Sequence, residues 1–152
     1  MKLRIEISDV SEEEVVIRCR ERTDITDKLV AAFSDISRLD TTLALTSEEK
    51  EHFVPVRQIL FFESAGKKVA AHTQEKCYFT DKRLYELEKI LGRTFVRVSK
   101  YCIVNSEKVS SISKGVTGSG EAFFDGTDKS AYISRAYYAV LKQIIYETRI
   151  KT

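Results

Sequence analysis

A chain of 152 residues is long enough for one domain with a small addition and a proper hydrophobic core. Apolar residues make up 43% and charged residues 32%, which is typical of a soluble globular protein. The sequence contains no run of about 18 apolar residues, so no membrane span is predicted. The net charge of +2 is unevenly spread: residues 1–51 hold 8 Lys+Arg and 13 Asp+Glu, whereas residues 52–152 hold 17 and 10. The balances of −5 and +7 favour an acidic leading segment before a part that binds a polyanion, although a merely basic surface is the alternative.

The cysteines and histidines argue against a metal site and for a reducing compartment. Cys19, Cys77 and Cys102 are odd in number, far apart and set among apolar neighbours, which predicts buried, reduced thiols and a cytoplasmic location. With only His52 and His72 in the chain, zinc ligands at usable spacing are missing, so we expect neither a metal nor a cofactor. The N-terminus alternates polar and apolar residues at once, and no signal peptide is predicted.

The first 40 residues predict a β-β-α segment. Alternation of apolar and polar residues indicates strands over 3–7 and 15–19. A helix follows with Thr23 or Asp24 as N-cap, and its apolar positions recur at helical spacing: Ile25, Leu29, Ala32, Phe33 and Ile36. A segment this small does not fold alone, so we expect it to pack on the rest of the chain or on a second copy. The best domain boundary lies near residues 38–40, which separates a leading segment, 1–40, from a domain, 41–152.

The middle of the chain is rich in strands. They are predicted over 41–46, 52–56, 58–64, 68–73 and 76–80. Pro55 limits its strand to a sheet edge or a strand end, whereas the continuously apolar 58–64 indicates a central strand covered on both faces. Residues 65–68 form a turn with Lys67 and Lys68 at its tip. Asp81 is expected to cap a short helix that ends at Gly92, with an inner face of Leu84, Leu87, Ile90 and Leu91.

The C-terminal part continues with strands and ends in a helix. Strands over 109–113 and 121–125 flank a glycine-rich stretch, which we interpret as a hairpin loop because a dinucleotide site requires a helix after its glycines. A short strand over 131–134 precedes a helix with Ser134 as N-cap and an apolar stripe of Tyr137, Val140, Leu141, Ile144 and Ile145. The predicted fold class is mainly β, or α+β overall, with short antiparallel sheets, a short helix and a C-terminal helix.

The stretch from Phe95 to Ile112 contains a dense polar group between apolar anchors. Arginine and lysine supply charge for phosphates, and Lys, Ser and Asn side chains also meet base edges in a major groove. The alternative is a solvated turn between two strands. The polar group consists of Arg97, Ser99, Lys100, Tyr101 and Asn105.

Residues from about 42 to 147 resemble a LytTR-type DNA-binding domain, the effector module of the LytR/AlgR group of bacterial transcription regulators. The matching signals, in the family's order, are I-L-F-F-E-S with its Gly-Lys-Lys turn, R-L-Y-E-L-E, F-V-R-V-S-K-Y-C-I-V-N and I-S-R-A-Y-Y-A-V-L-K. Two departures are Tyr101-Cys102, where the family often has Ser-Tyr or Ser-Phe, and Ala136, where it often has a second Arg. The leading segment resembles that of stand-alone members, which lack a receiver domain.

The resemblance implies double-stranded DNA as partner, bound by three loops. Groove-reading side chains are expected from Lys67 or Lys68, from Lys100, and from Arg135 or its neighbour, with Tyr137 in the same loop as Arg135. Arg97 and one hairpin lysine are expected on phosphates, Ser99 beside them, and Asn105 in a role that holds its loop. The resemblance also implies a homodimer on direct repeats, bending of the DNA, and for some members a small membrane protein that restrains them.

Two other functions are alternatives to DNA binding. A protein-interaction module would use the N-terminal segment and leave the basic face incidental. A small hydrolase or nucleotide-binding enzyme is disfavoured, because the chain has no nucleophile elbow, Walker pattern or carboxylate pair at useful spacing. We therefore expect a sequence-specific regulator with no catalytic residues and no small-molecule substrate.

Overall fold

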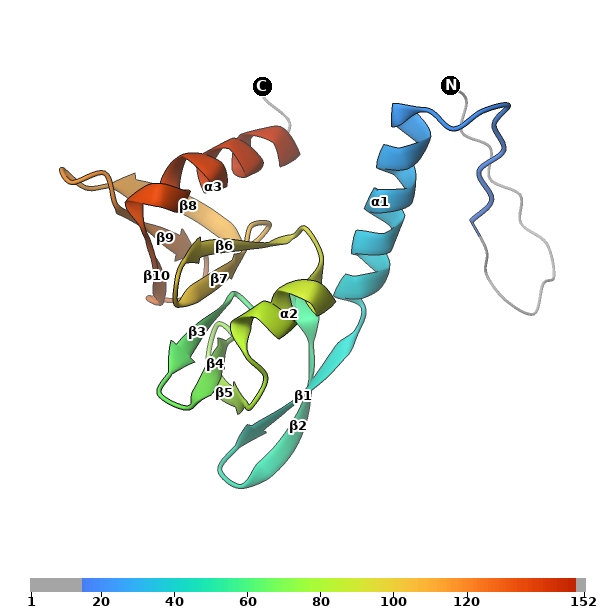
Figure 1. Cartoon of the computed structure of the whole chain (residues 1–152). Helices are drawn as coiled ribbons and strands as arrows, with labels where there is room; N and C mark the ends of the chain where they lie inside the picture. The colour runs from blue at the N-terminus through green and yellow to red at the C-terminus, as the bar shows by residue number, and fades with distance from the viewer. Residues whose placement is uncertain (1–14, 150–152) are drawn as a thin grey trace.

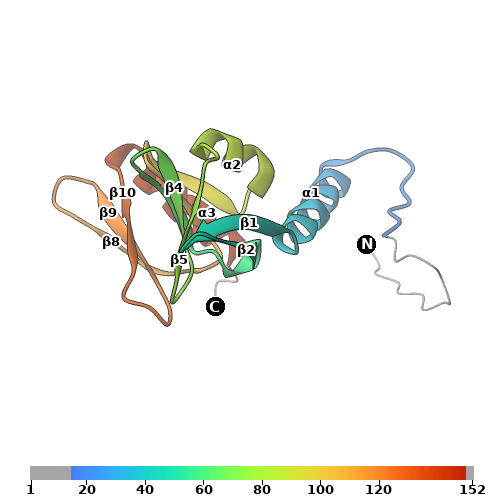
Figure 2. The same ribbon diagram turned by 90° about the horizontal axis from the view of Figure 1, so that it is seen from below.

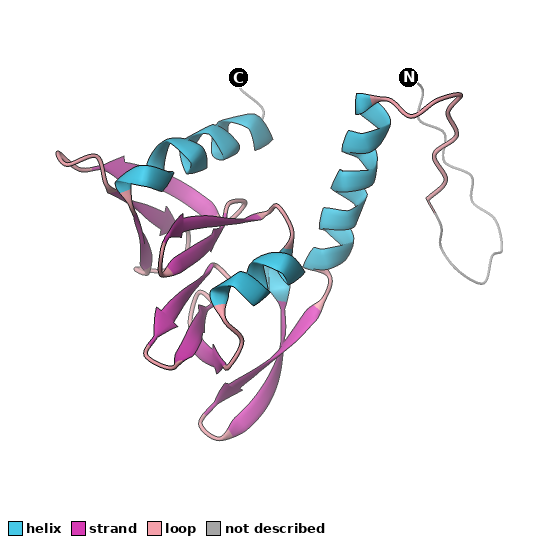
Figure 3. Ribbon diagram, viewed as in Figure 1, coloured by secondary structure: helices cyan, strands magenta, loops and turns pink. Residues whose placement is uncertain are grey.

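The computed structural model describes residues 15–149 of the chain. Strands dominate it, with three α-helices and one 3-10 helix, η1 (Figures 1 and 3). The sheet-rich α+β fold that the sequence predicts is thus confirmed. The elements run in the order α1 (Asp24–Leu39), β1 (Thr42–Ser47), β2 (Lys50–Pro55), η1 (Val56–Gln58), β3 (Phe61–Ala65), β4 (Lys68–His72), β5 (Cys77–Thr80), α2 (Leu84–Leu91), β6 (Phe95–Ser99), β7 (Cys102–Asn105), β8 (Val109–Lys114), β9 (Gly120–Phe124), β10 (Ser130–Ile133) and α3 (Arg135–Thr148).

The strands form two antiparallel sheets. The larger has the order β2-β1-β5-β4-β3-β7-β6, and the smaller has the order β10-β9-β8. Neighbouring residues of β3 point to opposite faces: Phe61 joins a core with the smaller sheet and α3, while Phe62 joins a core with β1 and α2. The prediction of a central strand covered on both faces holds for Phe61 and Phe62, whereas Glu63, Ser64 and Ala65, which lead into the β3–β4 turn, are exposed.

Several local predictions hold in the structure. Pro55 ends β2, which is an edge strand of the larger sheet. Gly92 follows α2 with φ of +74°, a conformation that suits glycine. The glycine-rich stretch joins β8 to β9 as a hairpin loop, as expected. Asn105 is buried and donates from Nδ2 to the Ile59 carbonyl at 3.1 Å, which supports its predicted role in holding its loop.

Other local predictions are wrong in detail. Asp81 does not cap α2; the helix begins after Arg83, whose backbone N–H donates to Glu86 Oε2 at 2.6 Å. Ile90 and Val140 were assigned to inner helix faces but are exposed, and the buried position of α3 is Tyr138 instead of the half-buried Tyr137. The other core positions hold as predicted: Leu84, Leu87, Leu91, Leu141 and Ile145 are buried, so each helix keeps its inner face and differs only at single positions.

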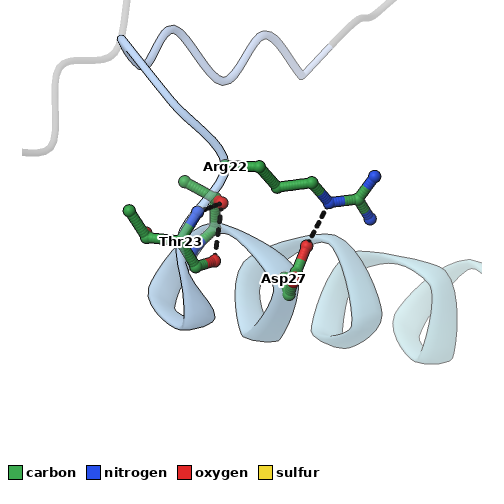
Figure 4. Close-up of polar contacts among 4 residues, drawn as sticks. Arg22, Thr23 and Asp27 are labelled. Carbon is green, nitrogen blue, oxygen red and sulfur yellow. Dashed lines mark hydrogen bonds and ion pairs between the residues drawn. The ribbon is translucent and has the colours of Figure 1, made fainter.

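The leading segment differs most from the prediction. Residues 15–22 form no strand and are exposed at Val15, Ile17 and Cys19, and the strand predicted over 3–7 lies outside the described residues. The helix is confirmed as α1, with Thr23 as N-cap. Figure 4 shows how it begins: Thr23 N–H donates to Thr26 Oγ1 at 2.9 Å, and Arg22 contacts Asp27. Its far end meets α2 and η1, while most of its length stands away from the sheets (Figures 1 and 2).

Two further findings concern the cysteines and the character of the helices. The prediction of three buried thiols is correct for Cys102, which is buried, but Cys77 is half-buried and Cys19 is exposed. All three are free thiols. Within residues 15–149, none of the helices combines the length and apolar character that crossing a bilayer requires.

Candidate nucleic-acid interface

The first predicted loop is the tight turn between β3 and β4. Ala65 pairs with Lys68 across the hairpin, so Gly66 and Lys67 are the two turn residues. Gly66 has φ of +64°, which a glycine adopts without a steric penalty and which a two-residue hairpin turn requires there. Lys67 and Lys68 are both exposed, and Lys68 Nζ lies 3.9 Å from Asp81 Oδ1. An exposed ion pair of this length is weak, so both ammonium groups are accessible to an anion.

The second loop is the turn between β6 and β7, where Lys100 and Tyr101 are exposed. A β-bulge between Arg97 and Ser99 precedes it and changes the direction of the strand end. The turn is held from inside: the Tyr101 N–H donates to Ser99 Oγ at 3.1 Å, and the Tyr101 carbonyl accepts from Ser64 N–H at 2.8 Å. Ser99 is only 5% exposed, so its hydroxyl supports the turn instead of facing solvent.

Arg97 is bound within the protein. Its Nε and Nη2 donate to the two carboxylate oxygens of Glu88 at 3.2 and 2.7 Å, and Nη1 donates to the Lys100 carbonyl at 3.1 Å. A guanidinium held by a carboxylate at two points has a fixed direction. Arg97 therefore connects α2 to the turn that carries Lys100, and its charge is opposed by Glu88.

The third loop is the connection from β10 into α3. The Ser134 N–H donates to the Val98 carbonyl at 2.8 Å, which fixes the start of α3 beside the end of β6. Arg135 is the first residue of α3 and is exposed. Its stem lies along the β8–β9 loop: a Cβ added at Gly118 would come within 3.0 Å of Arg135 Cγ and Cδ. This glycine leaves the space that the arginine stem occupies.

The three loops lie on one side of the molecule. Glu88, Arg97, Lys100 and Tyr137 line one shallow hollow, so the second and third loops share a surface. The Ser64–Tyr101 hydrogen bond attaches the strand of the first loop to the second. In Figures 1 and 2 the three turns lie away from α1, which projects on the opposite side. The strands therefore bring together residues that are up to about 70 positions apart in the sequence.

An acidic turn borders this surface. Glu48, Glu49 and Glu51, in and beside the β1–β2 turn, line a hollow that also includes Lys68. Because carboxylates repel phosphates, this hairpin limits how far a polyanion extends past the first loop.

Sequence reasoning missed two members of the site. No motif in the sequence marks Glu88 as a partner of Arg97, and the pairing depends on how α2 packs beside β6. Gly118 was interpreted only as part of a flexible loop, and its contact with Arg135 depends on the smaller sheet lying beside α3. The spacing of residues along the chain carries no signal for either contact.

Comparison with known proteins agrees with this geometry. The family model for the LytTr DNA-binding domain matches residues 49–146. An uncharacterized HTH-type transcriptional regulator from Staphylococcus aureus strain NCTC 8325 is 27% identical over 144 residues, covering 94% of this chain and 97% of the relative. A similarly named protein from strain MRSA252 is 31% identical over 106 residues, covering 69% and 71%.

A solved structure is similar in fold. The LytTr DNA-binding domain of a protein from Bacillus cereus superposes with a TM-score of 0.63 and 19% identity, over 69% of this chain and 96% of the other. The relatives' names refer to a helix–turn–helix, in which two helices follow one another. In the described part of this chain, by contrast, each of the three α-helices is separated from the next by strands.

Proposed function

Because the chain belongs to the LytTr DNA-binding domain family, we propose that it is a sequence-specific transcription regulator that binds duplex DNA through the three loops described above. The observation that carries this proposal is the placement of exposed cations from three separate loops on one rigid side of the β scaffold. We propose residues 41–152 as the DNA-binding domain, and residues 1–40 as a segment that joins two copies or receives a regulatory partner.

The exposed residues are assigned to the DNA. Lys100 and Arg135 are proposed to donate to guanine O6 and N7 in the major groove, each contributing about 1–3 kcal/mol of discrimination. Lys67 and Lys68 are proposed to read the groove or neutralise phosphates from the first hairpin, and Tyr137 to contact the backbone beside Arg135. Each phosphate contact adds about −0.9 to the slope of log affinity against log salt.

The half-buried and buried residues are assigned to support. Arg97 and Ser99, which the sequence associated with DNA, have their polar atoms engaged with Glu88, Lys100 and Tyr101. We propose that they fix the turn so that Lys100 is already in position before DNA binds. Pre-positioning lowers the entropy lost by the side chain and its turn on binding.

We further propose that two copies act together on a direct repeat in the cytoplasm and that the DNA bends between the contacted positions. Bending would let the deformability of the uncontacted base pairs contribute to specificity. Selection of bound duplexes from a random pool, with the full chain and with residues 40–152 in parallel, would show the repeat and its spacing. A change in donor–acceptor distance on an end-labelled duplex would measure the bend.

The site assignment predicts that Lys100→Ala combined with Arg135→Ala abolishes sequence preference while the fold remains intact. Loss of two groove contacts at about 1–3 kcal/mol each corresponds to a fall of roughly 30-fold or more in the ratio of specific to non-specific affinity. Fluorescence anisotropy with the selected and a scrambled duplex measures this ratio, and circular dichroism verifies folding.

A matched control is available on the opposite side of the molecule. Lys28→Ala with Arg57→Ala also removes one lysine and one arginine, both exposed, from α1 and η1. This control is expected to retain the preference. Retention of full preference in the Lys100/Arg135 variant would refute the assignment of these two residues.

A further inference from the structure

The helix α1 has a long apolar face that the rest of the described chain leaves uncovered. A helix of 16 residues with this much apolar surface exposed is unusual for an element that serves only its own domain. It also precedes residue 49, where the family match begins, so this face is not part of the core of that domain. The exposed fractions are 56% for Ile25, 40% for Leu29, 46% for Val30, 47% for Phe33 and 61% for Ile36.

The spacing of this face is that of a helix–helix seam. Ile25, Leu29, Ala32 and Ile36 are separated by four, three and four positions, which keeps them on one stripe along α1. Phe33 flanks the stripe on the same side. Alternation of three and four is the repeat by which two helices pack their side chains between one another. A second helix therefore fits this face better than a flat surface does.

The spacing of the seam, four, three and four positions, reads the same in both directions along the helix. This symmetry favours an antiparallel partner with the same sequence. In that arrangement Ile25 faces Ile36 of the other copy, and Leu29 faces Ala32. The small alanine then receives a large leucine, so each layer of the seam is filled. In a parallel pair Ala32 would face Ala32 and leave a gap at the centre, which costs stability.

The helix dipoles support the same direction. Two antiparallel copies of α1 oppose their dipoles, whereas a parallel pair aligns them. The face and its spacing thus identify a second copy as the occupant.

We infer that the exposed face of α1 is the surface through which two copies of this chain pair, with their α1 helices antiparallel. The inference rests on the proposed function in one respect, which is that two copies act together on DNA. An antiparallel pair has a two-fold axis, whereas a direct repeat relates its halves by translation. The two domains therefore have to turn about the Asp40–Thr41 connection when both copies occupy such a site.

The first test is the mass of the full chain in solution without DNA. A pair of helices this short buries less than a standard interface of about 1,600 Å², so a dimer in the micromolar range is expected and sedimentation should cover about 1–100 µM. The wild-type chain should approach twice the monomer mass. Leu29→Glu at the centre of the seam should weaken dimerisation at least tenfold. Ile90→Glu on α2, where the isoleucine is also 40% exposed, is the matched control and should leave it unchanged.

The second test is the direction of the pair, in a background where the exposed Cys19 is replaced by serine. Chains with Ile25→Cys should form a disulfide with chains carrying Ile36→Cys, and neither should link to itself. In the antiparallel pair two copies of residue 25 are 11 positions apart, about 16 Å at 1.5 Å per residue, which is beyond the reach of a disulfide. Self-linking of the Ile25→Cys chain would overturn the antiparallel arrangement.

The outcomes separate this inference from the proposed function. A wild-type chain that stays monomeric at 100 µM, or a Leu29→Glu chain that still dimerises, overturns the α1 interface. A monomeric wild type would indicate another occupant, such as the chain's own first residues or a different protein. Binding of Leu29→Glu to a single half-site duplex should equal that of wild type. If Leu29→Glu failed to bind the half-site, the result would count against the three-loop interface or against the independence of that interface from α1. Dimerisation is measured separately, without DNA.

Discussion

At the scale of single residues, the site depends on which side chains are free and which are engaged. Arg97 and Lys100 are three positions apart and carry the same charge, yet only Lys100 is exposed. The Arg97 guanidinium donates hydrogen bonds to the Glu88 carboxylate and to the Lys100 carbonyl. Because the charge of Arg97 is already opposed by Glu88, we expect Arg97 to assist DNA binding by holding the Lys100 turn in place and not by attracting phosphates. This distinction can be tested through Glu88.

We predict that Glu88→Ala reduces sequence preference even though it removes a negative charge near the DNA. Without Glu88, the Arg97 guanidinium loses two charge-assisted hydrogen bonds and the Lys100 turn loses its brace. The ratio of specific to non-specific affinity should fall by roughly tenfold, about 1.4 kcal/mol. Non-specific affinity at low salt should rise slightly, because one repulsive charge is gone.

Anisotropy titrations with the selected and scrambled duplexes measure both effects. Glu75→Ala removes an exposed acid from the β4–β5 turn and serves as the control for charge alone. A gain in specific affinity after Glu88→Ala would mean instead that the released Arg97 contacts a phosphate, as the sequence first predicted.

The three thiols are expected to differ widely in reactivity. Burial, followed by the nearby Glu63, raises the pKa of Cys102 to about 12. At pH 8 such a thiol is ionised to about one part in ten thousand, whereas an ordinary thiol with pKa of about 8.5 is ionised to about a quarter. Burial also raises the pKa of the half-buried Cys77, while Cys19 is exposed.

With an aromatic disulfide reagent under native conditions, we therefore predict one fast thiol, and Cys19→Ser should remove the fast phase. Cys102 should react only when the protein unfolds. A fast phase that persists in Cys19→Ser would show that the β5 or β7 region opens readily.

At the scale of elements, one hairpin turn carries Lys67 of the candidate site, and another contains a strained backbone. The β1–β2 turn places Glu48 and Glu49 at φ of 50° and 60°, in the left-handed region that favours Asn and Gly. In the β3–β4 turn the residue with positive φ is a glycine, Gly66, so this turn shows no such strain. The structure thus locates strain in the acidic turn beside the interface and not in the loop that carries Lys67.

We predict that Glu48→Asn with Glu49→Gly stabilises the protein, because both residues then suit the turn. The expected gain in free energy of unfolding is about 1 kcal/mol, measured by urea denaturation. Glu48→Gln with Glu49→Gln removes the same charges but keeps the unsuited backbone, so it should not show this gain. Equal stabilisation by both variants would attribute the effect to charge repulsion.

At the scale of the whole molecule, the side that carries the three loops and the side from which α1 projects lie opposite one another. This separation predicts that residues 41–152 bind a single half-site duplex with the same salt dependence as the full chain. The loops proposed to contact phosphates all lie in that part, so the slope of log affinity against log salt should change by less than about 0.9, the value of one contact. Anisotropy between 50 and 200 mM salt measures it.

The full chain should differ only on a duplex with two half-sites, where pairing of copies adds affinity. If truncation reduced the slope of log affinity against log salt by the value of about two phosphate contacts, the leading segment would also touch phosphates. The exposed arginines at 18, 20 and 22 would be the first candidates.

The sequence by itself determined the family and most of the elements from α1 onward. The strand pattern at 41–46, the continuously apolar run at 58–64, the glycines at turns and the ordered motifs from F-V-R-V-S-K to I-S-R-A-Y-Y are local signals, since strand patterning and turn chemistry act within a few residues. Only the tertiary structure decided that Glu88 holds Arg97, that Gly118 makes room for Arg135 and that the apolar face of α1 stays uncovered. Those facts depend on which elements pack together, and contact between distant segments leaves no periodic trace in the chain.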